Sequence, residues 1–382
     1  MPDDKFIDEF ISVANEVNPE SNTFLVNATD NPHYVKSKGK NVYLAKYGTG
    51  EFSRIVGDLS QYERVYIHFL TQEMCSFINK NAHKKVMFLW LFWGGDLYEH
   101  ITYPLLDEST QRYVKMRNRA FIPGLLMTIK SWRAKQREHS ERLRAIQRLS
   151  YILHFDEGEY RLVQKYFPTQ AKYLFFSYPN VLQFDLLDQP LDIDIVIAVT
   201  QERGIDLTKK ILLLGNSGWE VGNHLSVLQG CAASKKDDYQ IVVPLSYGNP
   251  DYIDYVIAQG KKLLGSAFVP LTTFLAPQIY SQLIKVAEAG VFNSRRTQGV
   301  GNIIALLYVG KQVFLNPVSL YYHFLCRRGV KVYSVDQLFS KEIEPLDSLS
   351  AEKNREIIKD MYSDKICKET IRKILNVKYI KQ

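Results

Sequence analysis

The sequence lacks the usual marks of a membrane-spanning, disulfide-bonded or zinc-binding protein. Its longest apolar run, VMFLWLFW at Val86–Trp93, is far shorter than the roughly 20 residues that cross a bilayer. The acidic start MPDDKFIDEF does not resemble a signal peptide, so we expect a cytoplasmic protein. Its four cysteines have no CxxC pair and no histidine at metal spacing. We therefore expect reduced thiols and no structural zinc.

Two familiar nucleotide-binding motifs are also missing. The sequence has no GxxxxGK[ST] loop, and LGNSGWEVGN lacks the GxGxxG spacing of a nicotinamide site. The stretch ILLLGNSG (211–218) nevertheless joins an apolar strand to a small-residue turn and a helical segment. Such a turn can bind an anion, because the first N–H groups of a helix have no partners within it.

The length and the pattern of the chain predict two α/β domains. A chain of 382 residues that is 46% apolar is too long for one ordinary core. In the first half, apolar strand-like runs near 23–28, 41–47, 64–70 and 85–93 alternate with helical segments. This alternation favours a doubly wound parallel sheet. We assign 1–190 to this domain, with 107–150 as a basic helical insertion.

A second alternation follows an acidic crossover at 183–208. Within the crossover, IDIVIAV (193–199) could itself be a strand. From 209 to 335, six strand-like runs alternate with five helical segments, which predicts a second doubly wound domain over 191–348. The polar tail 349–382 has helical periodicity, and we expect terminal helices that pack back onto the first domain. Ligands of such sheets bind at the carboxyl ends of the strands, so we expect a cleft there.

Four segments of the second domain fall at these strand ends: GNSG (215–218), PLSYGN (244–249), PLTTF (270–274) and NSRRTQGVGN (293–302). The last is the most informative, because Arg295 and Arg296 can donate bidentate hydrogen bonds to phosphate. Gly301 and Asn302 then open an apolar helix whose N-terminus favours negative charge. Together they predict a diphosphate site, although each glycine turn alone could be only a turn.

The first domain offers candidates for acid–base chemistry. In FWGGDLYEH (92–100), Gly94 and Gly95 allow close approach of a ligand, and Asp96 is placed to accept a proton. Tyr98 and Glu99 follow, and we expect them on the side of the cleft that binds the acceptor substrate. Asp96 could instead cap the next helix. His154, at the end of another strand, is the reserve candidate, although such a histidine is more often a packing residue.

The basic segment 121–148 suggests a surface for anionic lipid. The aliphatic FIPGLLMTI (121–129) precedes KSWRAKQREHSERLRAIQR (130–148), which has seven Lys or Arg and two Glu. This pattern suits a helix that inserts its apolar residues into a membrane and keeps its basic residues at the headgroups. It also suits a simple solvated helix. Interleaved aromatic residues are missing apart from Trp132, so we do not expect nucleic acid.

The second domain resembles a known family. LLLGNSGWEVGNH, IVVPLSYGNPDYIDYVIAQGKKLLG, VFNSRRTQGVGNIIALLYVG and, in the first domain, FWGGDLYE are similar to the bacterial TDP-N-acetylfucosamine:lipid II N-acetylfucosaminyltransferases of glycosyltransferase family 56. The resemblance implies a GT-B fold, with the nucleotide sugar on the C-terminal domain and the acceptor on the N-terminal one. The donor-binding residues it implies are Gly215, Asn216, Ser217, Gly218, Ser246, Tyr247, Gly248, Asn249, Arg295, Arg296, Gly301 and Asn302.

The resemblance also implies a function. It predicts transfer of a 4-acetamido-4,6-dideoxygalactose-like sugar from a dTDP-sugar to a polyprenyl diphosphate-linked saccharide at the inner membrane face, with inversion. No DxD motif stands at a strand end, which fits departure of the nucleotide without a metal or other cofactor. Two alternatives stay open: a GT-B enzyme that uses another UDP-, GDP- or dTDP-sugar, and a non-catalytic nucleotide-binding scaffold.

Overall fold

The computed structural model describes residues 1–118, 125–178, 184–234, 238–340 and 342–377, and side chains at 118 and 125–132 are not described. The chain divides into two compact units. The first contains Met1–Tyr103, Ile122–Asn180 and Asp364–Gln382, and the second contains Pro104–Phe121 and Val181–Ser363.

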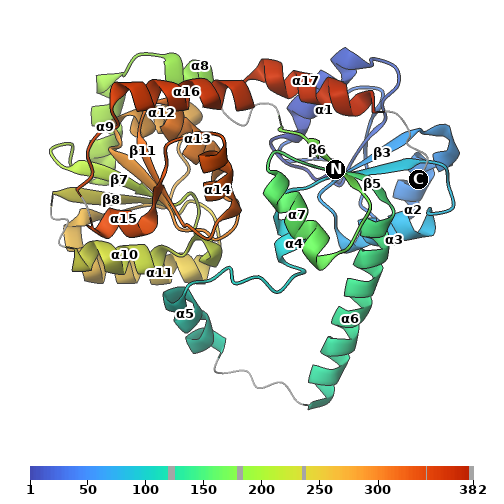
Figure 1. The fold of residues 1–382 in the computed structure, drawn as a ribbon, viewed down its shortest axis with the longest axis horizontal. Coiled ribbons are helices and arrows are strands. Elements are labelled where there is room, and N and C mark those ends of the chain that lie inside the picture. The colour runs from blue at the N-terminus through green and yellow to red at the C-terminus, as the bar shows by residue number, and fades with distance from the viewer. Residues whose placement is uncertain (119–124, 179–183, 235–237, 341, 378–382) are drawn as a thin grey trace. The chain divides into compact units, whose positions relative to one another are not determined.

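The first unit is built on parallel strands (Figure 1). Its four-stranded sheet has the order β3-β4-β5-β6, and β1 pairs with β2 in a separate parallel pair. The strand β4 is buried along its whole length, as expected for a strand covered on both faces. The elements are α1 (Ile7–Val17), β1 (Phe24–Val26), β2 (Val42–Leu44), α2 (Gly50–Val56), η1 (Leu59–Gln61), β3 (Arg64–His68), α3 (Gln72–Lys80), β4 (Met87–Leu91), α4 (Gly95–Tyr98), α6 (Leu125–Gln147), β5 (Leu149–His154), α7 (Glu157–Tyr166), β6 (Lys172–Phe175) and α17 (Asp364–Leu375).

The second unit is a six-stranded parallel sheet with the order β12-β11-β10-β7-β8-β9, as the six strand-like runs predict. Figure 1 shows α10 and α11 below this sheet and α12, α13 and α16 above it. The elements are α5 (Glu108–Asn118), α8 (Phe184–Asp188), α9 (Ile193–Arg203), β7 (Lys210–Leu214), η2 (Glu220–Gly222), α10 (His224–Ala233), β8 (Tyr239–Pro244), α11 (Pro250–Leu264), η3 (Gly265–Ala267), β9 (Phe268–Leu271), α12 (Pro277–Val286), β10 (Ala289–Phe292), α13 (Val300–Tyr308), β11 (Gln312–Leu315), α14 (Leu320–Arg327), β12 (Tyr333–Ser334), α15 (Val335–Ser340) and α16 (Ser348–Tyr362).

The alternative of a strand at IDIVIAV is wrong, because these residues form the helix α9. Asp192 caps its first turn by accepting a hydrogen bond from the Ile195 N–H at 3.1 Å, and Gly204 ends it in the left-handed conformation. Val196, Val199 and Thr200 are buried, at the spacing of one helix face. The two caps and this spacing outweigh the strand preference of the β-branched run.

The basic insertion 107–150 is not one structural unit. Its first part, α5, groups with the second unit, where Tyr113 joins the core and Ser109 donates a hydrogen bond to Gln229 at 2.8 Å. Its second part, α6, packs against α3 in the first unit. The short helix α8 also groups with the second unit, although it precedes residue 191. In the tail, α16 belongs to the second unit and α17 packs against α1 of the first.

Candidate functional site

Two loops at the carboxyl edge of the second sheet are joined by main-chain hydrogen bonds. The loop after β7 carries Gly215–Gly218, and the loop after β8 carries Ser246–Asn249. The Gly218 N–H donates to the Tyr247 carbonyl at 2.7 Å, and the Asn249 N–H donates to the Gly218 carbonyl at 3.0 Å. Gly215 donates to Val291 of β10 at 2.8 Å. The structure therefore brings GNSG and SYGN together as one rigid rim.

Glycine is required where these loops meet. Gly248 has φ +142°, and a Cβ there would lie 2.4 Å from the main-chain carbonyl of Gly218. A Cβ at Gly218 would lie 2.2 Å from the Ile253 side chain. Any side chain at these positions would push the loops apart, so both glycines shape the rim rather than offer it a functional group.

Three polar side chains link this rim to the loop before α13. The Asn216 amide donates to the Tyr247 hydroxyl at 3.1 Å, and the Gln298 amide donates to the Ser217 hydroxyl at 3.2 Å. Gln298 also lies 3.5 Å from the Asn216 side-chain oxygen. Ser217 is buried, whereas Tyr247 is half exposed. Gln298 was not among the predicted site residues, although it lies within the NSRRTQGVGN motif that pointed to them.

The N-terminus of α13 lies next to these side chains. Gly299, the N-cap of α13, has φ +70°, and a Cβ on it would lie 2.9 Å from the Asn216 side-chain oxygen. Among the described residues no side chain caps this helix, so its first-turn N–H groups, including those of Gly301 and Asn302, have no capping partner there. The Asn302 amide donates to the Tyr280 hydroxyl at 2.9 Å. The arrangement can accept an anion between Asn216, Gln298 and the helix N-terminus.

The two predicted arginines lie in the same loop. One nitrogen of Arg295, Nη1, donates to the main-chain carbonyls of Pro104 and Leu106 at 3.1 and 3.3 Å. The main-chain N–H of Arg296 donates to the Ser294 hydroxyl at 3.4 Å, and the Arg296 side chain is half-buried. Arg295 therefore also fastens the segment that leads into α5, a role that the sequence did not suggest.

A buried polar network fixes that segment to the strand ends. The Asp107 N–H donates to the Asn223 side chain at 2.9 Å, and Asn223 donates to the Leu105 carbonyl at 2.9 Å. The Asn293 amide donates to Ser226 at 2.9 Å, and Asn316 donates to Asn293 at 2.8 Å. Since the partners are up to 186 residues apart in sequence, no local signal could have identified this network.

Asn249, another predicted donor-binding residue, has structural partners. Its side-chain oxygen caps α11 by accepting from the Asp251 N–H, and its amide donates to Glu220 at 2.5 Å. Ser246 is half-buried beside it. Trp219 and Tyr247, from the two joined loops, are both about half exposed, at 46% and 52%. These rings give the rim an aromatic surface, and Trp219 was not predicted as part of the site.

In the first unit, Asp96 is a structural carboxylate. Its side chain is 1% exposed and accepts hydrogen bonds from the Leu70 N–H (2.9 Å), the Trp90 indole (2.7 Å) and the Trp93 N–H (3.1 Å). Burial raises the pKa of Asp96, while these donors and Arg142 lower it. A side chain so enclosed has no oxygen left to reach an acceptor hydroxyl. The geometry therefore favours a structural role for Asp96 over that of the predicted general base. Asp96 does not cap α4 either, because Gly94 is the N-cap.

The other predicted residues after β4 differ in exposure. Gly94 has φ +95° and is buried, and Gly95 is half-buried. Tyr98 is buried, and its hydroxyl donates to Glu159 at 2.9 Å. Glu99, at the end of α4, is exposed. Of the two carboxylates in this segment, Glu99 is therefore the one that can meet a substrate.

His154 is a buried neutral histidine. Its ring is 5% exposed and stacks on Phe155 with centroids 4.2 Å apart. Its Nδ1 lies 3.0 Å from the Asp156 main-chain nitrogen and 3.2 Å from the Asp156 carbonyl oxygen, so Asp156 can bond to this nitrogen in either neutral tautomer. Burial lowers the pKa of His154 to about 4. The buried, stacked ring fits the packing alternative for His154.

A family model described as "4-alpha-L-fucosyltransferase glycosyl transferase group 56" matches residues 127–364 of this sequence. The match covers more than half of the chain, including all the loops of the rim. The chain belongs to glycosyltransferase group 56.

Solved structures show the fold of this group 56 glycosyltransferase. A glycosyltransferase from Rickettsia africae has a TM-score of 0.64 at 11% identity, over 98% of this chain and 97% of that one. Alr3699/HepE from Anabaena, in complex with UDP and glucose, has a TM-score of 0.64 at 13% identity, over 96% and 94%. WaaG, from lipopolysaccharide biosynthesis, has a TM-score of 0.55 at 13% identity, over 97% and 96%. The predicted GT-B fold is thus confirmed.

The described residues of this group 56 glycosyltransferase contain neither a membrane-spanning helix nor a cluster of metal-ligating side chains. No described helix combines the length and apolarity that crossing a membrane requires. Within the same described ranges, no three His, Cys, Asp or Glu side chains gather as metal ligands. Part of the basic segment 121–148 falls on residues 121–124, which lie outside the described residues.

Proposed function

We propose that this group 56 glycosyltransferase transfers a 4-acetamido-4,6-dideoxygalactose-like sugar from a dTDP-sugar to a polyprenyl diphosphate-linked saccharide. The observation that carries the proposal is the meeting of GNSG, SYGN and TQGVGN around the N-terminus of α13. Hydrogen-bond donors and a helix dipole at one point suit a diphosphate. HepE, a protein of the same fold, binds UDP-glucose.

In this proposal, the second unit holds the donor and stabilises the leaving nucleotide. The α13 N–H groups, Gln298 and the guanidinium of Arg296 receive the negative charge that develops on the diphosphate as the glycosidic bond breaks. Arg295 binds the diphosphate with the part of its guanidinium that does not hold Pro104 and Leu106. Trp219 and Tyr247 offer ring faces to the base or the sugar. The proposal includes no metal ion.

The first unit holds the acceptor. Inversion requires a base that takes the proton of the acceptor hydroxyl as that oxygen attacks the anomeric carbon. Because Asp96 is enclosed, we assign this role to Glu99, which is exposed and follows directly on α4. The lipid part of the acceptor places the enzyme at the inner membrane face, where the basic helix α6 meets anionic headgroups.

The test is a donor panel on the purified full chain. We expect release of dTDP from dTDP-4-acetamido-4,6-dideoxygalactose when a lipid-linked disaccharide is present, and no change in rate with EDTA. Release that depends equally on a UDP- or GDP-sugar would replace the donor assignment with the alternative of another nucleotide sugar. Binding of dTDP with no turnover of any sugar would contradict the catalytic proposal and favour the scaffold alternative.

A further inference from the structure

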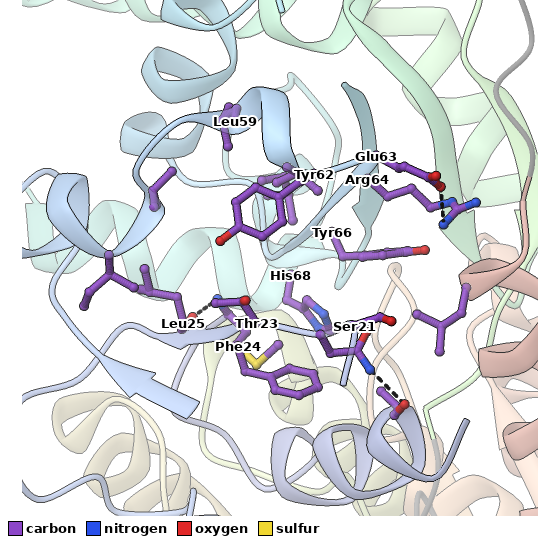
Figure 2. A pocket seen from close by; sticks show the side chains of 18 of the residues that line it. Ser21, Thr23, Phe24, Leu25, Leu59, Tyr62, Glu63, Arg64, Tyr66 and His68 are labelled. Atoms are coloured by element: carbon purple, nitrogen blue, oxygen red, sulfur yellow. Dashed lines mark hydrogen bonds and ion pairs between the residues drawn. The ribbon is translucent and has the colours of Figure 1, made fainter. Parts of the chain in front are cut away.

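A pocket of about 780 Å³ lies inside the first unit, away from the residues of the proposed reaction. Figure 2 shows Thr23, Phe24 and Leu25 of the β1 segment around the same pocket as Tyr66 and His68 of β3. Every residue from Glu63 to His68 lines it, so it follows the whole length of β3. The pocket is therefore elongated along a strand.

Within the part of the chain that the structure describes, the outer edge of β3 has no paired strand. There, β3 is the end strand of its sheet and pairs only with β4. Glu63 accepts from Met87, and Phe69 donates to Leu91, so odd-numbered residues bond to β4. In a parallel strand the intervening residues face the other side. The main-chain groups of Arg64, Tyr66 and His68 thus point away from β4, and none has a main-chain partner among the described residues.

The edge of β1 that faces away from β2 has a single neighbour among the described segments. Phe24 donates to Asn41, and Val26 accepts from Ala45, so these residues bond on the β2 side. On the opposite side, Met1 donates to the Leu25 carbonyl at 2.9 Å and accepts from the Asn27 N–H at 2.8 Å. Pro2 and Asn27 form a parallel bridge. The chain at Met1 therefore already runs as a strand parallel to β1.

Apolar side chains cover the pocket on both faces of the sheet. Phe10 and Leu375, from α1 and α17, belong to one core cluster with Leu89 of β4. On the opposite face, Phe77 of α3 packs edge-on against Phe88 of β4, with centroids 6.3 Å apart. Phe10, Leu375 and Phe77 all line the pocket. A strand buried on both faces is a continuous apolar run, and this pocket has the lining that such a strand needs.

We propose that the pocket is a slot for one extended apolar peptide strand that lies next to Met1, parallel to β1 and β3. The filled sheet has the order β2-β1-slot-β3-β4-β5-β6. Alternate residues of this strand bond to β1, in register with Met1, and the others bond to Arg64, Tyr66 and His68. A peptide strand can use the main-chain groups of both edges at once.

The test fuses the six residues Met-Lys-Val-Ile-Val-Val ahead of Met1 of the full chain. The matched control is Met-Lys-Val-Pro-Val-Pro, which removes the donors at the two positions that face β3. We expect the first extension to slow amide exchange of Arg64, Tyr66 and His68 at least tenfold and to raise Tm, and the control to do neither. Equal exchange in the two proteins would overturn the proposal.

A second measurement tests the proposal even if the fused protein folds poorly. The peptide Lys-Val-Ile-Val-Val, added to the chain without an extension, should raise Tm, and Lys-Val-Pro-Val-Pro should not. A rise with a long-chain fatty acid but with neither peptide would overturn the proposal and make the pocket a lipid site. Because dTDP binds the second unit in the proposed function, its Kd should be the same in all these samples.

Discussion

Asp96 and Glu99 should have different roles: we expect Asp96 to stabilise the fold and Glu99 to act in catalysis. Asp96→Asn places an amide N–H against one of the three donors that now bind the carboxylate, so we expect a loss of about 2 kcal/mol in the free energy of unfolding. The folded fraction should keep most of its kcat. Glu99→Gln should leave Tm unchanged and lower kcat about 100-fold or more, the usual effect of losing a general base. Thermal unfolding and initial rates measure both.

Asp96→Glu and Glu99→Asp are the matched controls for this pair. A longer carboxylate does not fit the enclosed Asp96 site, whereas a shorter one at the exposed Glu99 can retain part of the activity. If Glu99→Gln kept the kcat of the unmodified enzyme, Glu99 would not be the base. If Asp96→Asn abolished kcat at unchanged Tm, the original prediction from the sequence would return.

The two arginines should differ in what their removal costs. Arg296→Ala should raise the Kd for dTDP about tenfold at unchanged Tm, since a charge-assisted hydrogen bond contributes about 1.5–3 kcal/mol. Arg295→Ala should weaken binding and also lower Tm, because it releases the Pro104 and Leu106 carbonyls. Calorimetry with dTDP measures Kd. Lys261→Ala, on the exposed end of α11, controls for lost charge, and an equal effect there would contradict a specific phosphate role.

Single residues mark the limit of sequence-based prediction here. The segment FWGGDLYEH correctly indicated a turn after a strand, but it could not show that Asp96 faces Leu70 and Trp90, because those donors are placed by tertiary packing. The motif TQGVGN correctly indicated the N-terminus of α13. Gln298 was missed because its importance depends on the position of Ser217, which lies 81 residues away in sequence.

At the scale of elements, periodicity predicted the strands well and one helix poorly. All six strands of the second sheet coincide with apolar runs, and each run lies between turns that contain glycine or polar residues. The helix α9 was ambiguous because Ile and Val at successive positions favour strands, while its caps, Asp192 and Gly204, favour a helix. Both caps are local sequence signals, and together they favour the helix over the strand.

The helix α6 has two ends with different surroundings. At its carboxyl end, Arg142 is 1% exposed and donates to the Leu70 and Asp96 carbonyls at 2.9 and 3.0 Å, so this arginine belongs to the core. Burial lowers its pKa. Along 133–140 the side chains are exposed. A membrane contact through α6 can therefore involve Arg133, Lys135 and Arg137, but not Arg142.

Charge reversal in this exposed stretch tests the membrane prediction. Arg133→Glu with Arg137→Glu should reduce flotation with anionic vesicles at least tenfold, because each basic residue near such a surface contributes about 1 kcal/mol. Lys353→Glu with Lys365→Glu, on exposed positions of α16 and α17, is the matched control. Flotation lost equally in both double variants would indicate only a net-charge effect, and undiminished flotation of the α6 variant would contradict the prediction.

At the scale of the whole molecule, the sequence predicted two α/β units but misplaced the segment between them. Residues 107–118 were predicted as part of a basic insertion in the first domain, yet Asp107 and Tyr113 bind them to the second unit. Hydrogen bonds between residues more than 100 positions apart in sequence decide which unit this segment joins. No change in composition along the sequence indicates these contacts. The pattern of strands and helices is local, whereas the membership of a connecting segment is not.

Both units contain a buried histidine whose titration should limit stability in acid. Burial lowers the pKa of His154 in the first unit and of His224 in the second, each to about 4. His224 packs beneath the rim, where a Cβ on Gly215 would lie 2.7 Å from its Nε2. An unfolded chain binds a proton at each near pH 6.5, so above that pH neither histidine affects stability. As pH falls from 6.5 towards 4, the unfolded state gains protons that the folded state excludes, and stability declines.

Each histidine should therefore remove up to about 3 kcal/mol from the free energy of unfolding between pH 6.5 and pH 4. Urea unfolding at a series of pH values measures this slope, followed by tryptophan fluorescence. His154→Gln and His224→Gln should each flatten the slope, even where they lower stability at pH 7.5, because the slope depends on the titrating ring and not on packing. His323→Gln, at an exposed position, should leave it unchanged. A slope that none of the three substitutions alters would assign the acid sensitivity to groups other than these buried rings.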